Sequence, residues 1–132
     1  MDNPETPVQL NEIAQIALTV GNLAEARAFY RDVLGMRFLF DAGTMSFFQC
    51  GSVRLMIGTS EKQADPGSTI LYFRVAQIRE AHASLRAKGV AFAQEPHLVA
   101  RMKSHDLWLA FFKDPAGNTL ALMSEEAREE KA

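Results

Sequence analysis

The chain has 132 residues, 48% of them hydrophobic, and its 14 basic and 16 acidic side chains give a formal net charge of −2. This length fits one domain with a buried core, and the balanced charge argues against a nucleic-acid partner. The apolar runs of the sequence are too short to span a bilayer, so no membrane partner is expected.

Residues 1–11 are predicted to form a flexible tail. They are acidic, contain two prolines and lack the basic start and apolar stretch of a secretory signal. Cys50 is the only cysteine, so no disulfide can form within the chain. We therefore expect a cytoplasmic protein, because thiols stay reduced in that compartment.

Two segments, residues 15–35 and 70–89, resemble each other in sequence pattern. Each passes from a short apolar strand into a helix whose apolar residues recur at helical spacing and which ends at a glycine. Asn22, followed three residues later by a glutamate, has the arrangement of a helix capping box. Gln77 begins a weaker copy of it in the second segment. This repetition predicts two structurally equivalent modules.

Strand-like stretches punctuated by glycines and turn residues follow each helix. They are residues 36–43, 44–51 and 52–59 in the first half, and residues 90–97, 106–114 and 118–124 in the second. Each half therefore predicts a βαβββ unit, and the fold class is α+β. Because each unit leaves one apolar sheet face, two of them should pack sheet against sheet or curl into a shared cup.

The same pattern predicts the organisation of the chain. The two βαβββ modules are expected at residues 12–63 and 70–124, with ADPGST at residues 64–69 as the linker. Residues 125–132 are strongly charged with no apolar face and are expected to be a solvated tail.

Two motifs carry a resemblance to a known family. AEARAFYRDVLGM in the first half and FFKDPAGNTLALM in the second resemble the vicinal oxygen chelate superfamily, which includes glyoxalase I, bleomycin-resistance proteins and extradiol dioxygenases. The resemblance runs from Glu12 to Ser124 and implies a curved, cup-shaped mixed sheet with the helices outside. It also implies a homodimer, because two modules leave sheet edges and an apolar flank to cover.

The resemblance implies four metal-ligand positions in the cup, two from each module. They are occupied here by Gln15, Met56, Ile70 and Ala121. Only the glutamine can donate an oxygen, whereas divalent metals need several hard or borderline ligands. We therefore expect no metal and no other cofactor, and a divalent metal held by a non-standard set of residues is the alternative.

Two histidines are the candidate catalytic residues. His97 and His105 could close over the mouth of the cup and exchange protons near neutrality, or could merely satisfy loop backbone groups. If its strand is regular, His105 points to the opposite face from Asp106.

The cup orientation implied by the resemblance gives a set of candidate ligand-binding residues, together with Trp108 as an expected pocket edge. The set is Gln15, Arg54, Met56, Ile70, Tyr72, Trp108 and Ala121. The aromatic pairs Phe47/Phe48 and Phe111/Phe112 add one further candidate each, but alternation alone leaves open which member of each pair faces the cup.

Two classes of function follow. The first is a protein that binds a small apolar or aromatic molecule without a metal, similar in logic to bleomycin-resistance proteins. The second is an enzyme, either a lactoylglutathione-lyase-like protein or another isomerase or lyase, with a non-standard metal site or with His97 or His105 as the acid-base group.

Overall fold

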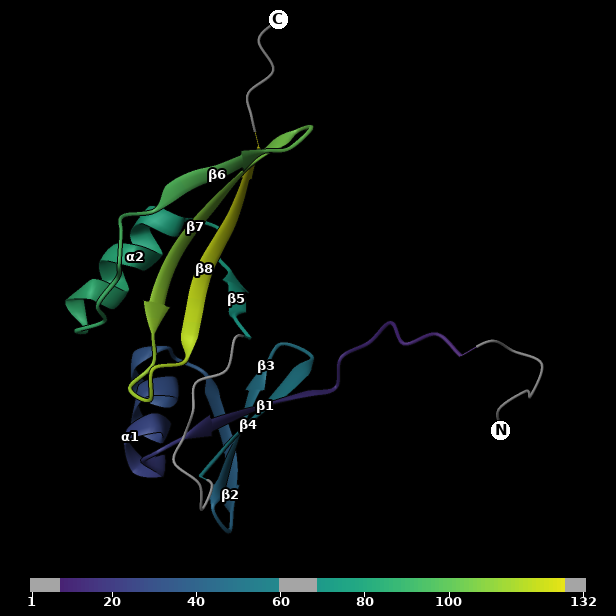
Figure 1. Ribbon diagram of the computed structural model, residues 1–132, viewed down its shortest axis with the longest axis vertical. Helices are drawn as coiled ribbons and strands as arrows, with labels where there is room; N and C mark the ends of the chain where they lie inside the picture. Colours follow the sequence, from purple (N-terminus) through teal and green to yellow (C-terminus); the bar gives the residue numbers. More distant parts are fainter. Residues whose placement is uncertain (1–7, 60–68, 128–132) are drawn as a thin grey trace, which may run out of the picture.

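The computed structural model describes residues 8–59 and 69–127. Most of the expected linker and the ends of both tails lie outside these ranges. Within them the chain forms the predicted pair of βαβββ modules (Figure 1). No helix of the described residues has the length and apolar character needed to cross a membrane.

The first module forms one mixed four-stranded sheet with its helix on one face. Its elements are β1 (Gln15–Val20), α1 (Leu23–Ala28), the π-helix η1 (Phe29–Val33), β2 (Arg37–Ala42), β3 (Met45–Cys50) and β4 (Val53–Thr59). The strand order is β1-β4-β3-β2, with β1 and β4 parallel and the other pairs antiparallel.

The second module repeats this topology. Its elements are β5 (Leu71–Arg74), α2 (Ile78–Ala87), β6 (His97–Arg101), β7 (His105–Lys113) and β8 (Thr119–Ala127). The strand order β5-β8-β7-β6 matches that of the first sheet, and β5 and β8 are again the parallel pair. The predicted α+β fold of tandem modules is confirmed.

The helical segments of the two modules differ in their N-terminal caps and in their length. The side chain of Asn22 accepts a hydrogen bond of 3.0 Å from the Glu25 backbone N–H, as the capping box predicts, whereas the side chain of Gln77 makes no capping hydrogen bond. Gly35 and Gly89 end the two helical segments at φ +74° and +93°, values that favour glycine. The first segment is one residue longer between cap and glycine, and η1 absorbs the extra residue as a π-helical turn.

Two predicted strand boundaries are wrong. Residues 90–96 make only an isolated bridge, Phe92 with Phe112, and β6 begins at His97 instead. Val90 and Phe92 pack inward against the core, and Pro96 has no N–H with which to extend a ladder.

The predicted charged tail also begins too early, because β8 continues to Ala127. The acidic residues in this stretch alternate between the two faces of the sheet and find partners on each. Glu125 pairs with Arg74 at 3.2 Å, and Glu126 pairs with Arg79 of α2 at 3.3 Å. These ion pairs allow a charged segment to remain in the sheet.

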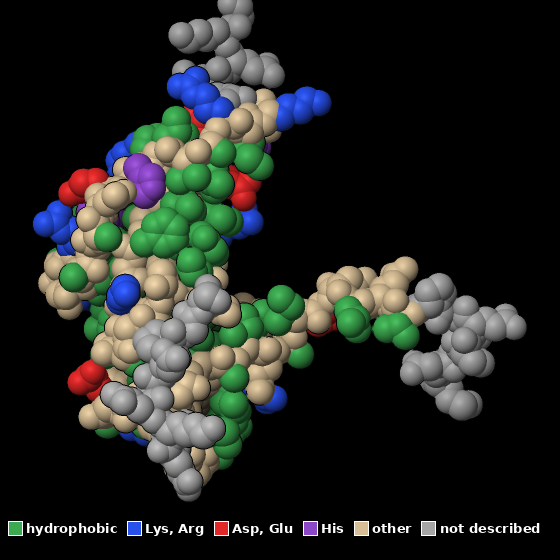
Figure 2. All heavy atoms as spheres, viewed as in Figure 1, with side chains coloured by type: hydrophobic (Ala, Val, Ile, Leu, Met, Phe, Trp, Pro, Cys, Tyr) green, Lys and Arg blue, Asp and Glu red, His purple; other side chains and the backbone are tan. Residues whose placement is uncertain are grey.

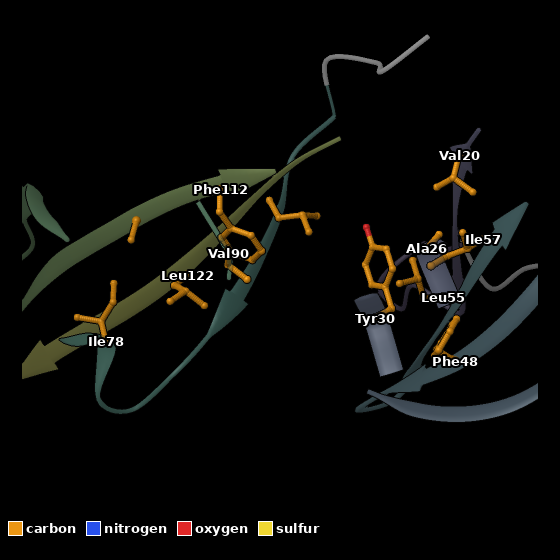
Figure 3. Packing of buried hydrophobic residues seen from close by; sticks show 12 residues of the cluster. Val20, Ala26, Tyr30, Phe48, Leu55, Ile57, Ile78, Val90, Phe112 and Leu122 are labelled. Atoms are coloured by element: carbon orange, nitrogen blue, oxygen red, sulfur yellow. The ribbon is translucent and has the colours of Figure 1, made fainter. Parts of the chain in front are cut away.

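The helix-covered faces of the two sheets contribute to one hydrophobic core (Figure 3). Figure 3 shows the core side chains in two groups, one from each module, with Tyr30 at the edge of the first group that lies nearest the second. The fully buried side chains include Tyr30 and Phe48 from the first module and Ile78 and Leu120 from the second. The modules therefore pack as one unit.

A buried carboxylate joins the modules at this edge. Asp114, in the turn between β7 and β8, accepts a 2.8 Å hydrogen bond from the Tyr30 hydroxyl and backbone N–H bonds from Ala116 and Asn118. The Asn118 amide donates to Asp114 and also to the Thr19 carbonyl of the first module. Burial, reinforced by the negative charge of Asp114, raises the pKa of the Tyr30 hydroxyl above its usual range.

Replacement of Tyr30 by phenylalanine should lower the free energy of unfolding by about 1–3 kcal/mol, because a buried carboxylate oxygen loses a donor. The native protein should also lose stability above about pH 10, where Tyr30 of the unfolded chain ionises and folded Tyr30 does not. Tyr30→Phe should remove that part of the pH dependence. Urea unfolding at pH 7 to 11 measures both effects.

Tyr72 provides the matched control, because it is the only other tyrosine and its side chain is 47% exposed. Tyr72→Phe should change the unfolding free energy by less than about 0.5 kcal/mol. Equal effects of the two substitutions would show that the Tyr30–Asp114 bond does not hold the modules together.

Candidate ligand-binding faces

Each sheet has a face that turns away from its helix, which we call the open face. Figure 1 shows α1 and α2 on one side of the molecule and the N-terminal arm on the other. The strand register shows which side chains lie on each open face, because residues paired across neighbouring strands point to the same side of the sheet. The open face of the first sheet carries Gln15, Ala17, Phe40, Phe47, Arg54 and Met56, and that of the second carries Tyr72, Arg74, His97, Leu109, Phe111 and Ala121.

On the first sheet an arginine is held beside an aromatic shelf. Arg54 Nε donates a 2.7 Å hydrogen bond to Gln15 Oε1, and its guanidinium carbon lies 5.6 Å from the centroid of the Phe47 ring. Phe40 stacks on Phe47, with centroids 4.6 Å apart and an interplanar angle of 21°. Within residues 8–59 and 69–127 Arg54 forms no ion pair. Its other N–H groups can therefore meet a ligand.

On the second sheet the open face is mostly apolar. Tyr72 and Phe111 meet edge to face, with centroids 6.1 Å apart. Both pair with Ala121, which is fully buried between their strands. Figure 2 shows hydrophobic side chains gathered in a band along this module. An apolar surface with aromatic walls and few polar groups suits a small apolar or aromatic molecule.

The four positions that a metal would require do not supply a suitable donor set. Gln15 and Met56 are neighbours, with Gln15 Nε2 3.9 Å from the methionine sulfur. Ile70 precedes β5 and lines a cavity of about 250 Å³ together with Ile16 of the first module. Ala121 offers only a methyl group.

The one oxygen among these positions is already engaged by a cation. Gln15 Oε1 accepts the Arg54 hydrogen bond, and the guanidinium charge at that distance would repel a metal ion. Nowhere in the described residues do three or more His, Cys, Asp or Glu side chains gather in a way that could hold a metal. The residues therefore do not fit a divalent metal centre.

The two candidate histidines are not brought together. On β7, His105 lies four residues from Leu109, the partner of His97, which separates the two by roughly 13 Å along the strand. His97 Nδ1 lies 3.2 Å from the Glu95 carbonyl oxygen, and His105 Nδ1 lies 2.8 Å from Ser104 Oγ. Each imidazole therefore contacts a residue one or two positions away in the sequence and not the other histidine.

Trp108 lies on the helix-covered face and not on the open face. It pairs with the buried Ser124, and its ring lies 4.5 Å from the guanidinium carbon of Arg79 on α2. The indole Nε1 is buried there without a hydrogen-bond partner in the described structure. The sequence alone did not determine which residues of β7 face the helix, and the pairing of β7 with β8 determines it.

Strand register also shows which member of each phenylalanine pair lies on the open face. Phe47 and Phe111 lie on open faces, whereas Phe48 and Phe112 lie in the core. Phe40 was not predicted as a site residue. A register shift between Phe38 and Phe40 turns it to the open face, and no pattern in the sequence marks that irregularity.

Comparison with known proteins agrees with this architecture. The family model of the Glyoxalase/Bleomycin resistance protein/Dioxygenase superfamily matches residues 12–122. A search of curated proteins found no match.

Several solved structures have the same fold. A lactoylglutathione lyase from Agrobacterium tumefaciens is 22% identical, with a TM-score of 0.73 over 86% of this chain and 92% of the other. A glyoxalase/bleomycin resistance protein/dioxygenase from Nocardioides is 15% identical, with a TM-score of 0.72 over 96% and 93%. A virulence protein from Salmonella typhimurium is 19% identical, with a TM-score of 0.73 over 89% and 98%. At these identities the similarity shows the fold alone.

Truncation of the neighbouring residues Phe111 and Phe112 tests the assignment of faces. Phe112→Ala should lower the free energy of unfolding by about 3–5 kcal/mol, because it leaves a cavity in the core. Phe111→Ala should lower it by less than about half as much, because its ring lies on the open face and is half-buried. Urea unfolding of the two variants measures the difference, and the reverse order would mean that the β7 register is wrong.

Proposed function

Because the chain belongs to the Glyoxalase/Bleomycin resistance protein/Dioxygenase superfamily, we propose that it uses the family cup to bind a small apolar or aromatic molecule without a metal ion. The observation that carries the proposal is the Gln15–Arg54 hydrogen bond. It engages the only oxygen at the four metal-ligand positions and leaves a guanidinium beside two stacked phenylalanines. Such a site holds a ligand by aromatic contact and hydrogen bonds.

We also propose that the cup is completed by a second copy of the chain. Val8, Leu10 and Ile13, on the arm before β1, have exposed fractions of 84%, 96% and 62%. Figure 1 shows this arm extending away from both modules. Apolar side chains this exposed are typical of an interface, and in a two-fold dimer each arm would pack on the other copy.

The metal-free proposal predicts that the purified protein contains well below one metal ion per chain. Its melting temperature should not move when nickel, zinc, manganese or iron(II) is added, whereas 2-naphthol should raise it, because only a ligand of the folded state stabilises it. Phe40→Ala should weaken 2-naphthol binding about fivefold, since the stacking partner of Phe47 is lost. Elemental analysis, thermal shift and calorimetry provide the three readouts.

Leu98→Ala is the control for Phe40→Ala. Its side chain is similarly exposed, 37% against 45%, but it lies on the helix-side register of β6. It should leave 2-naphthol binding unchanged. A bound metal near one per chain, with a thermal shift abolished by His97→Ala or His105→Ala, would replace this proposal with a lyase or isomerase that uses those histidines as ligands.

The dimer proposal predicts twice the monomer mass by light scattering at micromolar concentration. Leu10→Asp should raise the dimer dissociation constant at least about tenfold, because it would bury a charge in an apolar contact. Ala24→Asp, at an exposed position of α1, should not change it. A native protein that is monomeric at this concentration would contradict the proposal.

A further inference from the structure

A groove between the modules is lined mainly by residues of the helix-covered faces. It has a volume of about 540 Å³ and runs between α2 and β5 of the second module and the η1–β2 and β3 segments of the first. Leu34, Phe73, Leu85 and Phe112 form part of its apolar wall. This volume is within the range of small-molecule sites. We propose that the groove binds a small monocarboxylate with an apolar body.

The groove exists because the two modules are not perfect copies. If the helices are aligned at Asn22 and Gln77, Phe29 and Tyr30 correspond to Ser84 and Leu85. In the first module the two aromatic rings fill the junction, and Tyr30 reaches Asp114 in the β7–β8 turn.

At the equivalent junction of the second module, the smaller Ser84 and Leu85 line the groove. The facing turn is also shorter there. Only Gly51 and Ser52 separate β3 from β4, against the five residues 114–118 between β7 and β8. Smaller side chains on one wall and a shorter turn on the other leave the space open.

The charged residues of the groove indicate the kind of molecule that it could bind. Among the described residues that line it, Arg37 and Lys88 are the only charged ones, and none is a carboxylate. Neither forms an ion pair within the described part of the chain. The Lys88 ammonium donates a 3.4 Å hydrogen bond to the Val33 carbonyl oxygen. Two cations above an apolar floor favour an anionic head with an apolar body over a neutral or cationic molecule.

The inference does not rest on the proposed function, because none of the groove residues is Gln15, Arg54, Phe40 or Phe47. Most groove residues lie on the helix-covered faces. Arg37 and Gln49 pair with each other, and Gln49 pairs with Arg54, so these two belong to the open face of the first sheet, but the groove shares no residue with the Arg54 site. Each can therefore be tested while the other is monitored.

Cys50 provides a direct readout of occupancy. It lines the groove, it is the only cysteine, and its side chain is partly exposed as a free thiol. We expect octanoate to slow alkylation of Cys50 by the neutral reagent N-ethylmaleimide at least fivefold at saturation, because the bound chain covers the thiol. Octan-1-ol, which has the same length without the charge, should protect much more weakly at equal concentration. Mass spectrometry of the intact protein follows the rate.

The double variant Arg37→Gln, Lys88→Gln separates charge from apolar contact. It should weaken protection by octanoate about tenfold, as expected for the loss of charge-assisted contacts, and leave the effect of octan-1-ol unchanged. Arg101→Gln, at an exposed position on β6 outside the groove, should behave as the native protein. Ser84→Phe, which copies the first module, should reduce protection by both molecules.

Three results would overturn the inference: no protection by octanoate, equal protection by octan-1-ol, or an unchanged response of the double variant. Binding of 2-naphthol should be the same in the native protein and the double variant. If octanoate fails while 2-naphthol still depends on Phe40, the groove proposal alone is lost. If Ser84→Phe does not fold, the charge variant and the pair of probes still decide the question.

Discussion

The hydrogen bonds of the Asp114 carboxylate are the constraint on which the rest of the structure depends. Four donors converge on this buried group: the Tyr30 hydroxyl, two backbone N–H groups of its own turn and the Asn118 amide. A buried carboxylate is costly unless all its acceptor sites are used, so the turn and the first helix must both be in place before it can be satisfied. Because Tyr30 and Asp114 belong to different modules, this requirement fixes how the modules sit on each other. It gives the segments AEARAFYRDVLGM and FFKDPAGNTLALM a shared physical role, because Tyr30 lies in the first and Asp114 in the second.

The π-helix η1 contains Tyr30, which makes this contact in the first module, and α2 of the second module has no equivalent of it. One residue more than in α2 lies between the helix cap and the terminal glycine, and the wider turn accommodates it around Phe29 and Tyr30. The second copy has a regular α2 with Ser84 and Leu85 at the matching places. The duplicated topology therefore does not produce duplicated packing. One junction is closed by a hydrogen bond, and the other remains a hollow with two cations on its wall.

Features set by residues a few positions apart were predictable from the sequence, whereas features set by the register between strands were not. The Asn22 cap and the helix-ending glycines involve residues a few positions apart, so their spacing alone identifies them. Arg54 was also placed correctly beside Met56, because residues two apart on a strand share a face. Phe47 and Phe48 are adjacent and equally apolar, so only the register with β4 distinguishes them. Trp108 was misplaced for the same reason, and Phe40 was missed because an irregularity in β2 turns it over.

The Gln15–Arg54 pair changes the means by which the open face could recognise a ligand. In the family's metal-dependent members a cation held by protein oxygens attracts the oxygens of the bound molecule. Here the guanidinium of Arg54 carries a positive charge, and its hydrogen bond to Gln15 fixes its position. A guanidinium remains charged at any pH that the fold survives and presents its donors in a fixed plane. In the proposed metal-free site, charge and direction would be supplied by Arg54 without the Lewis acidity of a metal, a combination suited to recognition of a molecule and not to stabilisation of an enolate.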